Sequence, residues 1–170
     1  MFRKMRRKGQ ALSLEECAKI LKQGTSGVLA LSGDENYPYA VPISFVYDGT
    51  KLYFHCAKSG HKLDAIQRNC KVSFCVIDQD SVIPGAYTTH YKSVVVFGKM
   101  RILEEAEKRN AIEKLAAKYA PDDDGIRRQS AIDSGWMSLC VLEMTIDHMT
   151  GKASMELIRA RLQEKESLQR

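Results

Sequence analysis

The stretch Tyr53–Ile66, Tyr-Phe-His-Cys-Ala-Lys-Ser-Gly-His-Lys-Leu-Asp-Ala-Ile, runs from an apolar, aromatic strand through a short Lys-Ser-Gly loop into a helix. A helix that begins directly after a strand presents unpaired backbone N–H groups, and its dipole adds partial positive charge. His61 and Lys62 add two basic side chains at this point, beside Ser59. The stretch therefore indicates an anion site, with a phosphate-bearing ligand as the first candidate. An ordinary connection with solvated basic residues would read the same way.

Composition describes an ordinary globular chain of one domain. The sequence has 170 residues, 44% of them hydrophobic, which is enough for a core without disulfides or metal. The net charge of +5 comes from the first eight residues: they hold five of the 26 Lys and Arg residues, and the remaining 21 balance the 21 Asp and Glu residues. We therefore expect no nucleic-acid partner, because a basic N-terminal arm alone supports one weakly.

Targeting and redox features point to the cytoplasm. The basic start leads into too short an apolar stretch for a secretory signal, and no apolar run reaches the ~20 residues of a membrane helix. We therefore expect no membrane partner. The cysteines are odd in number, and most lie within apolar segments, which is typical of reduced, buried thiols. They are Cys17, Cys56, Cys70, Cys75 and Cys140.

Local patterns predict six or more strands, mostly antiparallel, with three or four peripheral helices. Ser13 and Glu16 form a capping box that begins a helix over 13–23. Pro38 and Pro42 predict that their strand is an edge, bulged or irregular, because proline donates no ladder hydrogen bond. Gly98 predicts a bulge. The expected strands cover 27–31, 37–47, 51–56, 71–77, 91–103 and 138–146. The further expected helices cover 61–69, 104–119 and 126–133. We also expect a loop over 78–89, a turn at 150–152 and a tail from residue 155 that is helical in part.

Metal and nucleophilic sites receive little support from the same residues. His55 and Cys56 are adjacent on a strand, so their side chains point to opposite faces, and no Cys-x-x-Cys pair exists. The Gly-x-Ser-x-Gly elbow and both glycine-rich phosphate signatures are absent from the sequence. We expect neither a metal ion nor a catalytic dyad.

The order of motifs along the chain closely resembles the flavin-binding split-barrel proteins related to pyridoxamine 5'-phosphate oxidase, in particular their nitroimidazole-resistance, nitroreductase-like branch. The resemblance covers about residues 5–152. It rests on Pro38-Tyr-Ala-Val-Pro-Ile-Ser44, Tyr47-Asp-Gly49, Tyr53-Phe-His-Cys-Ala57, Gly60-His-Lys-Leu-Asp64, Asn69, Val72-Ser-Phe74, Tyr91-Lys-Ser-Val-Val-Val-Phe-Gly98 and Lys118-Tyr119.

The resemblance implies an α+β, mainly β fold: a six-stranded antiparallel split β-barrel with peripheral helices. It divides the chain into a basic arm (1–12), an FMN-binding domain (13–152) and a charged tail (153–170). It also implies a homodimer with FMN at the subunit interface. His61 and Lys62 replace the Arg-Lys pair that holds the FMN phosphate in the oxidases, and Ser93 replaces a glutamine that contacts the ring. The implied cofactor-binding residues are Val41, Pro42, Ile43, Ser44, His55, Cys56, Ala57, Lys58, His61, Lys62, Ser93 and Trp136.

The chemistry implied is that of the flavin, with no catalytic side chain: reduction of a small electrophile such as a nitroimidazole, with NAD(P)H as donor. The oxidases' substrate-phosphate arginines have no counterparts here, which argues against pyridoxamine-phosphate oxidation. Two alternatives stay open. The chain could bind flavin without turnover, as a sensor or store, or the barrel could hold haem or the deazaflavin F420. Trp136 could equally belong to the core.

Overall fold

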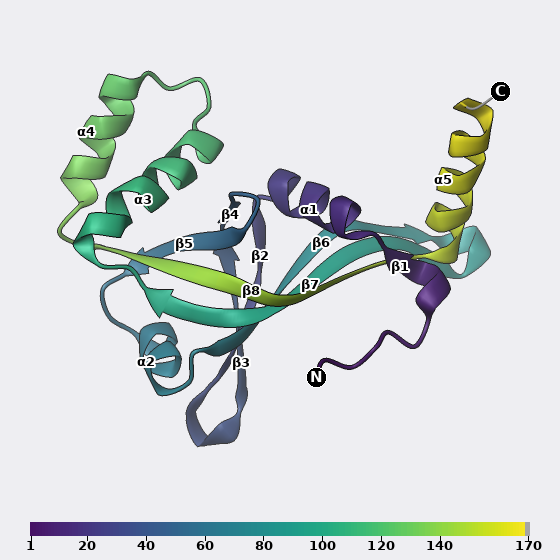
Figure 1. Cartoon of the computed structure of the whole chain (residues 1–170), viewed down its shortest axis with the longest axis horizontal. Helices are drawn as coiled ribbons and strands as arrows, with labels where there is room; N and C mark the ends of the chain where they lie inside the picture. The colour runs from purple at the N-terminus through teal and green to yellow at the C-terminus, as the bar shows by residue number, and fades with distance from the viewer. Residues whose placement is uncertain (169–170) are drawn as a thin grey trace.

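The computed structural model describes residues 1–168 and contains one eight-stranded antiparallel sheet that curls into a split barrel (Figure 1). The strand order is β3-β2-β6-β7-β8-β5-β4, with β1 paired to β8. The strands are β1 (Ala11–Leu12), β2 (Ser26–Ser32), β3 (Pro38–Ser44), β4 (Val46–Tyr47), β5 (Lys51–Ala57), β6 (Lys71–Ile83), β7 (Thr88–Ile102) and β8 (Leu139–Ala153).

The helices lie around the sheet. They are α1 (Leu14–Gln23), α2 (His61–Arg68), α3 (Glu105–Tyr119), α4 (Gly125–Gly135) and α5 (Met155–Leu168), with short 3-10 turns at Lys8–Gln10, Asp34–Asn36 and Pro84–Ala86. In Figure 1, α3 and α4 form a pair at one end of the molecule and α5 lies at the other. The predicted α+β split barrel is confirmed. The six long strands are those expected, and the two-residue strands β1 and β4 raise the number to eight.

The barrel interior is held by aromatic side chains in edge-to-face contact. Phe54 is fully buried on β5, and its ring lies 5.1 Å from that of Phe74 at an angle of 79°. Phe45 meets Phe74 at 4.8 Å and 71°. Phe45 also interrupts the predicted strand over 37–47, which divides into β3 and β4 on either side of it.

The first helix forms as predicted. The Ser13 hydroxyl accepts a hydrogen bond from the Glu16 amide at 3.2 Å, and the Glu16 carboxylate accepts one from the Ser13 amide at 2.8 Å. This capping box satisfies two of the helix's free N–H groups and stabilises it by about 0.5–2 kcal/mol. Cys17, Ile20 and Leu21 are buried on one face of α1, which closes one side of the barrel.

The prediction of a loop over 78–89 is wrong. Strands β6 and β7 continue through this region and pair from Gln79 and Lys92 to Ile83 and Thr88. This part of the hairpin extends beyond the barrel core, so both of its faces carry polar side chains and the apolar alternation that marks a strand is missing. Only the 3-10 turn at Pro84–Ala86 and Tyr87, in the left-handed conformation, break the strands.

The prediction of a turn at 150–152 is also wrong, because β8 runs straight through it to Ala153. Gly151 serves close packing there. A Cβ at this position would lie 2.4 Å from the Cys17 sulfur and 2.9 Å from the Leu12 Cβ. The bulge predicted at Gly98 is confirmed by the shift in register between Phe97 and Gly98 along β7 and β8. A glycine inside a strand therefore marks close approach or a bulge here.

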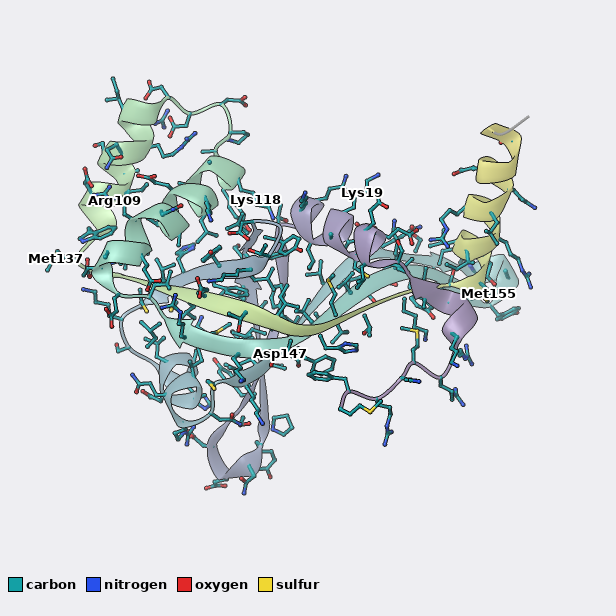
Figure 2. All side chains as sticks on the ribbon, viewed as in Figure 1. Lys19, Arg109, Lys118, Met137, Asp147 and Met155 are labelled. Atoms are coloured by element: carbon teal, nitrogen blue, oxygen red, sulfur yellow. The ribbon has the colours of Figure 1, made fainter. Side chains whose placement is uncertain are left out.

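The end of α3 is fixed to the barrel by two side chains. Lys118 lies near the C-terminal end of α3 (Figure 2). Its ammonium donates to the Gly24 carbonyl and lies 4.4 Å from the centre of the Phe45 ring. The Tyr119 hydroxyl donates to the Thr25 carbonyl and accepts from the Phe45 amide at 2.9 Å. Burial lowers the pKa of Lys118. These contacts join α3 to the start of β2 and to the junction of β3 and β4.

The N-terminal segment is attached to the sheet in two places. Ala11 and Leu12 pair with β8, and the Phe2 ring stacks on His148 at 4.7 Å and 12°. Within residues 1–168, no helix has the length and apolar character to cross a membrane. In the same part of the chain, no three His, Cys, Asp or Glu side chains are grouped as metal ligands.

Candidate functional site

A cavity of about 210 Å³ lies where β5 ends and α2 begins. Its walls come from three elements: the end of β5, the loop and first turn of α2, and one side chain of β3. Cys56 and Ala57 come from β5, and His61 and Lys62 come from α2. Tyr39, Ser59, Gly60 and Leu63 complete the lining. The stretch Tyr53–Ile66 thus contributes most of a concave site.

The N-terminus of α2 is open toward this cavity. Gly60 is the N-cap residue, and no side chain of the described residues caps the helix. The Gly60 carbonyl accepts from the Leu63 amide at 2.9 Å and from the Asp64 amide at 3.3 Å, so the helix is hydrogen-bonded from its first turn. Gly60 has φ 128° and ψ 166°, a conformation that essentially only glycine adopts. The backbone conformation at Gly60 therefore gives a polar ligand access to the amides of the first turn.

His61 is already engaged by neighbouring groups. Its ring stacks on Tyr39 at 4.2 Å and 15°, and its Nε2 lies 3.5 Å from the Asp34 carboxylate. Arg68, at the other end of α2, donates to the same carboxylate at 2.6 Å. These contacts fix the orientation of His61 and tie the turn between β2 and β3 to α2. Lys62 lines the cavity without any such ion pair among the described residues.

Cys56 brings a protonated thiol to the cavity wall. It lies directly opposite Cys140 in the pairing of β5 with β8, and both side chains face the barrel interior. Burial, with a smaller contribution from Cys140, raises the pKa of Cys56 to about 11, although the Lys62 charge acts the other way. At neutral pH the thiol of Cys56 is therefore uncharged, so an anion in the cavity meets no repulsion from it.

Strand β3 presents a free edge beside the cavity, as its prolines predict. It is the terminal strand of the sheet order and pairs only with β2. Val41 and Ile43 follow Tyr39 on the side of the strand that packs on the core. A proline in an edge strand turns its nitrogen away from the neighbouring strand, so the backbone of Pro42, and by alternation that of Ser44, faces the free edge. These groups are available to a flat ligand lying along β3.

The remaining predicted residues lie outside this cavity. Lys58 is exposed in the loop and is outside the cavity lining. His55 is on the opposite face of β5 and lines a separate cavity under α3 and α4. Ser93 lies on β7, three strands away from β3 in the sheet. Trp136 ends α4, where Lys108 and Arg109 lie over its ring at 4.1 and 4.7 Å.

The comparison with protein-family models decides the family. Residues 13–153, which contain the barrel, the cavity and the β3 edge, match the model described as pyridoxamine 5'-phosphate oxidase. The chain belongs to the pyridoxamine 5'-phosphate oxidase family. No curated protein matches the sequence.

Solved structures of this family's fold agree with the architecture. One is described as a candidate 5-nitroimidazole antibiotic resistance protein of Bacteroides thetaiotaomicron, with 24% identity, a TM-score of 0.71, and coverage of 84% of this chain and 86% of that one. Another is a conserved hypothetical protein of Mycobacterium tuberculosis (18%, TM-score 0.75, 88% and 90%). A third is an FAD and haem binding protein of Mycobacterium smegmatis (22%, TM-score 0.71, 86% and 74%). At these identities the likeness shows the fold.

Sequence reasoning missed two residues of the site. Tyr39 could have been found, because it lies two positions before Val41 and alternation places both on the same strand face. Asp34 gave no such signal, since it belongs to an ordinary Gly-Asp-Glu-Asn turn whose position beside α2 follows only from the pairing of β2 with β3.

Proposed function

We propose that this member of the oxidase family binds FMN and uses it to reduce a small electrophile. One observation carries the proposal: the open N-terminus of α2, with Lys62 beside it, forms an anion-sized cavity next to the free edge of β3. A phosphate fits the cavity, and a flat ring with hydrogen-bonding edges fits the free edge of β3. Family membership makes a flavin the ligand that best explains both together.

The residues present fit the phosphate end of FMN. Lys62 supplies a positive charge, and the first-turn amides of α2 supply directed N–H groups at the positive end of the helix dipole. His61 is held by Asp34, so it positions the helix turn and contributes charge only when protonated. Ser59 adds a hydroxyl that can donate to a phosphate oxygen.

The chain's own residues would orient the flavin and would not take part in bond making. A bound flavin supplies two-electron transfer, which needs no catalytic dyad from the protein. The backbone of Pro42 and Ser44 would fix the ring against β3, while Val41 and Ile43 keep that strand on the core. The neutral thiol of Cys56 would keep the wall near the phosphate free of competing negative charge.

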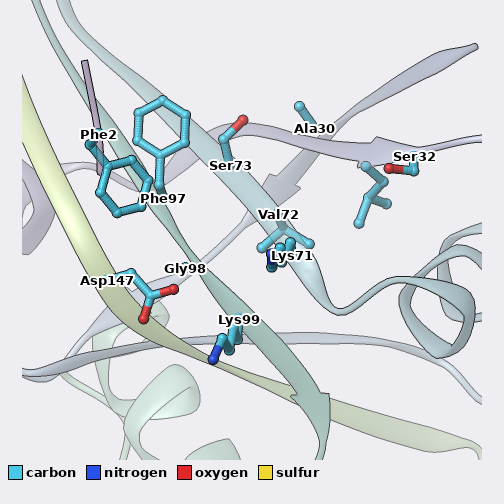
Figure 3. A pocket seen from close by; sticks show the side chains of 11 residues that line it. Phe2, Ala30, Ser32, Lys71, Val72, Ser73, Phe97, Gly98, Lys99 and Asp147 are labelled. Atoms are coloured by element: carbon cyan, nitrogen blue, oxygen red, sulfur yellow. The ribbon is translucent and has the colours of Figure 1, made fainter.

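A homodimer would complete this site. The outer face of the sheet exposes apolar side chains that a second copy would cover: Val28 is 40% exposed, Ile77 64% and Phe97 36%. Phe2 already packs on this face, with its ring 5.4 Å from that of Phe97, beside a hollow of about 600 Å³ (Figure 3). The dimer implied by the resemblance would bring Ser93 or Trp136 of one subunit toward the flavin of the other, since neither residue reaches the cavity of its own subunit.

The acceptor and donor form the finer part of the proposal. A nitroimidazole or similar electrophile as acceptor is supported by the fold shared with the B. thetaiotaomicron protein, and NAD(P)H is the usual two-electron donor to such flavins. The alternatives make different predictions. A flavin store would bind FMN without turnover, and a haem or F420 protein would show the spectrum of that cofactor.

The direct test is titration of the purified protein with FMN, followed by absorbance and flavin fluorescence. We expect saturable binding, which Lys62→Ala weakens about tenfold to a hundredfold, because a charge-assisted contact to phosphate is lost. Lys22→Ala removes an exposed lysine on α1 and should leave the affinity unchanged. Equal affinity in wild type and Lys62→Ala would place the phosphate elsewhere.

Turnover is tested on the same preparation. Under anaerobic conditions, NADH or NADPH should bleach the flavin band, and a nitroimidazole added afterwards should restore it. Bleaching without restoration would exclude this acceptor class, and FMN binding without bleaching would favour the store.

A further inference from the structure

The hollow of about 600 Å³ on the outer face of the sheet shares no lining residue with the cavity beside α2. Strands β2, β6, β7 and β8 form it, together with Phe2 of the N-terminal segment (Figure 3). Two phenyl rings, two lysines, two serines and one aspartate are among its lining residues. The proposed flavin site uses none of them.

The two lysines of the hollow stand next to each other. Lys71 and Lys99 are direct partners in the antiparallel pairing of β6 with β7, so their side chains lie on the same face of the sheet. Like charges in directly opposite positions destabilise a sheet. In the described part of the chain neither ammonium group forms an ion pair. The pair therefore lacks a counter-charge.

The usual role of exposed strand lysines does not explain this pair. Lysines often protect the edge of a sheet from pairing with another molecule, but β6 lies between β2 and β7, and β7 lies between β6 and β8. Asp147 is the carboxylate of the lining, and it reaches neither lysine within ion-pair distance in the described residues. Even a closer Asp147 would leave one of the two positive charges unmatched. An anion that bridges both ammonium groups would match them.

The rest of the lining adds a hydrogen-bond donor and an aromatic surface. The Ser32 hydroxyl accepts from the Asn69 side-chain amide at 3.1 Å, so its own proton is available to a ligand. Phe97 is 36% exposed and Phe2 43%, with their rings 5.4 Å apart. In Figure 3 these rings lie together, apart from the lysines. Phe97 and Lys99 are two residues apart on β7, a separation of about 7 Å along the strand.

We propose that this hollow binds a nucleoside 5'-monophosphate, with its phosphate between Lys71 and Lys99 and its base against Phe97 and Phe2. The phosphate would accept charge-assisted hydrogen bonds from two ammonium groups that otherwise repel each other. The base would cover exposed aromatic surface, on which any base can stack. The volume lies within the roughly 300–1,000 Å³ of small-molecule sites.

This site goes beyond the proposed flavin site and does not depend on it. The hollow must stay open when a second copy covers the neighbouring apolar side chains of the sheet. Titration of the full chain in its own oligomeric state includes this condition in the test.

The test uses adenosine 5'-monophosphate (AMP) as the probe, with isothermal titration at low ionic strength. We expect saturable binding with a dissociation constant below about 1 mM. Adenosine lacks the phosphate and should bind at least about tenfold more weakly, and ribose 5-phosphate lacks the base and should bind at least about fivefold more weakly. Lys71→Met and Lys99→Met should each weaken AMP binding about tenfold, whereas Lys22→Met, at an exposed lysine of α1, should leave it within about twofold.

The stability of the ligand-free protein gives a second measurement. Lys99→Met removes the repulsion, so it should raise the thermal midpoint by up to about 4 °C while it weakens AMP binding. Lys71→Glu places opposite charges on the two strands, so it should also raise the midpoint and should abolish AMP binding. Lys22→Met should leave the midpoint unchanged. A lysine with a merely structural role would lower the midpoint when it is replaced.

Four results would overturn the proposal: no saturable AMP binding by the wild type, equal binding of AMP and ribose 5-phosphate, loss of AMP binding in Lys62→Ala, or dissociation of an oligomer by Lys99→Met. The third would place AMP in the cavity beside α2. The fourth would mean that a carboxylate of a second copy lies between the lysines. AMP binding by protein that takes up no FMN would support this site while contradicting the flavin proposal.

Discussion

The two faces of β5 lead to two different cavities. The inner face carries Leu52, Phe54 and Cys56 into the barrel and ends at a cavity with a lysine and an open helix N-terminus. The outer face carries Tyr53 and His55 toward α3 and α4 and ends at an apolar cavity. Residues adjacent in sequence thus line two cavities of opposite character, and strand alternation decides which cavity each one joins.

The largest expected effect comes from the inner face. Phe54→Ala should lower the free energy of unfolding by about 3–5 kcal/mol, because it removes a fully buried ring that contacts Phe74 inside the barrel. Leu139→Ala, at the half-buried wall of the outer cavity, should cost clearly less. Urea unfolding of both variants measures the difference, and similar losses would mean that the two cores are equally packed.

The second prediction concerns the thiol on the inner face. Because the pKa of Cys56 is raised to about 11, it has roughly a hundredfold less thiolate at pH 8 than an ordinary thiol, and it should react that much more slowly with a disulfide reagent. Exposed Cys70 should react first. Mass spectrometry of partly labelled protein assigns the sites. Early labelling of Cys56 would show a more open cavity than the structure has.

The third prediction concerns a carboxylate on the outer side, next to Tyr53. Burial alone would raise the pKa of Asp48, but hydrogen bonds from Lys114 and from the Lys51 and Thr50 amides hold it well below the usual value. A lowered folded-state pKa gives stability that is present above the unfolded pKa of about 3.9 and is lost as pH falls toward the folded value. Asp48→Asn should therefore cost about 1–2 kcal/mol at pH 7.

Its pH dependence provides the control for that variant. The wild type should lose stability more steeply than Asp48→Asn below about pH 4, so their unfolding free energies should converge in acid. Parallel curves from pH 7 to pH 3 would contradict the role given to the Asp48–Lys114 pair.

The last prediction concerns the glycine between β5 and α2. The added methyl group of Gly60→Ala would meet open space. The backbone at this position has a positive φ, however, which costs any residue with a Cβ about 1–3 kcal/mol. A shift of the first turn of α2 can relieve part of this strain. Gly125→Ala, also in open space but without a positive φ, should be neutral or slightly stabilising. The thermal unfolding midpoints of the two variants give the comparison. Equal midpoints would mean that a side chain at position 60 causes no backbone strain.

Local chemistry made much of the fold predictable from the sequence. Ser13 and Glu16 mark the start of α1, and Pro38 and Pro42 mark an edge strand, because each signal depends on hydrogen bonds within a few residues. Gly151 misled the same reasoning. A residue with a Cβ at position 151 would clash with the sulfur of Cys17, which is 134 positions earlier in the sequence. No local sequence pattern indicates such a contact.

The candidate site was predictable in part for the same reason. The cavity residues from Cys56 to Lys62 are close in sequence, so one strand-loop-helix pattern is enough to group them. His55 was placed with them by resemblance, whereas alternation along β5 turns it to the other face. Strand order decides that Asp34 approaches His61 and that Ser93 lies far from the cavity. Local sequence patterns do not specify strand order.

The free edge of β3 has one more consequence, for the behaviour of the protein at high concentration. An exposed strand edge normally recruits the edge of another molecule and so begins a growing aggregate. Pro38 and Pro42 remove alternate N–H donors from this edge, so a second strand cannot complete a regular ladder along it. A flat ligand needs only one or two of the remaining groups. The same two prolines would thus admit a small molecule to the edge while keeping the protein from polymerising through it.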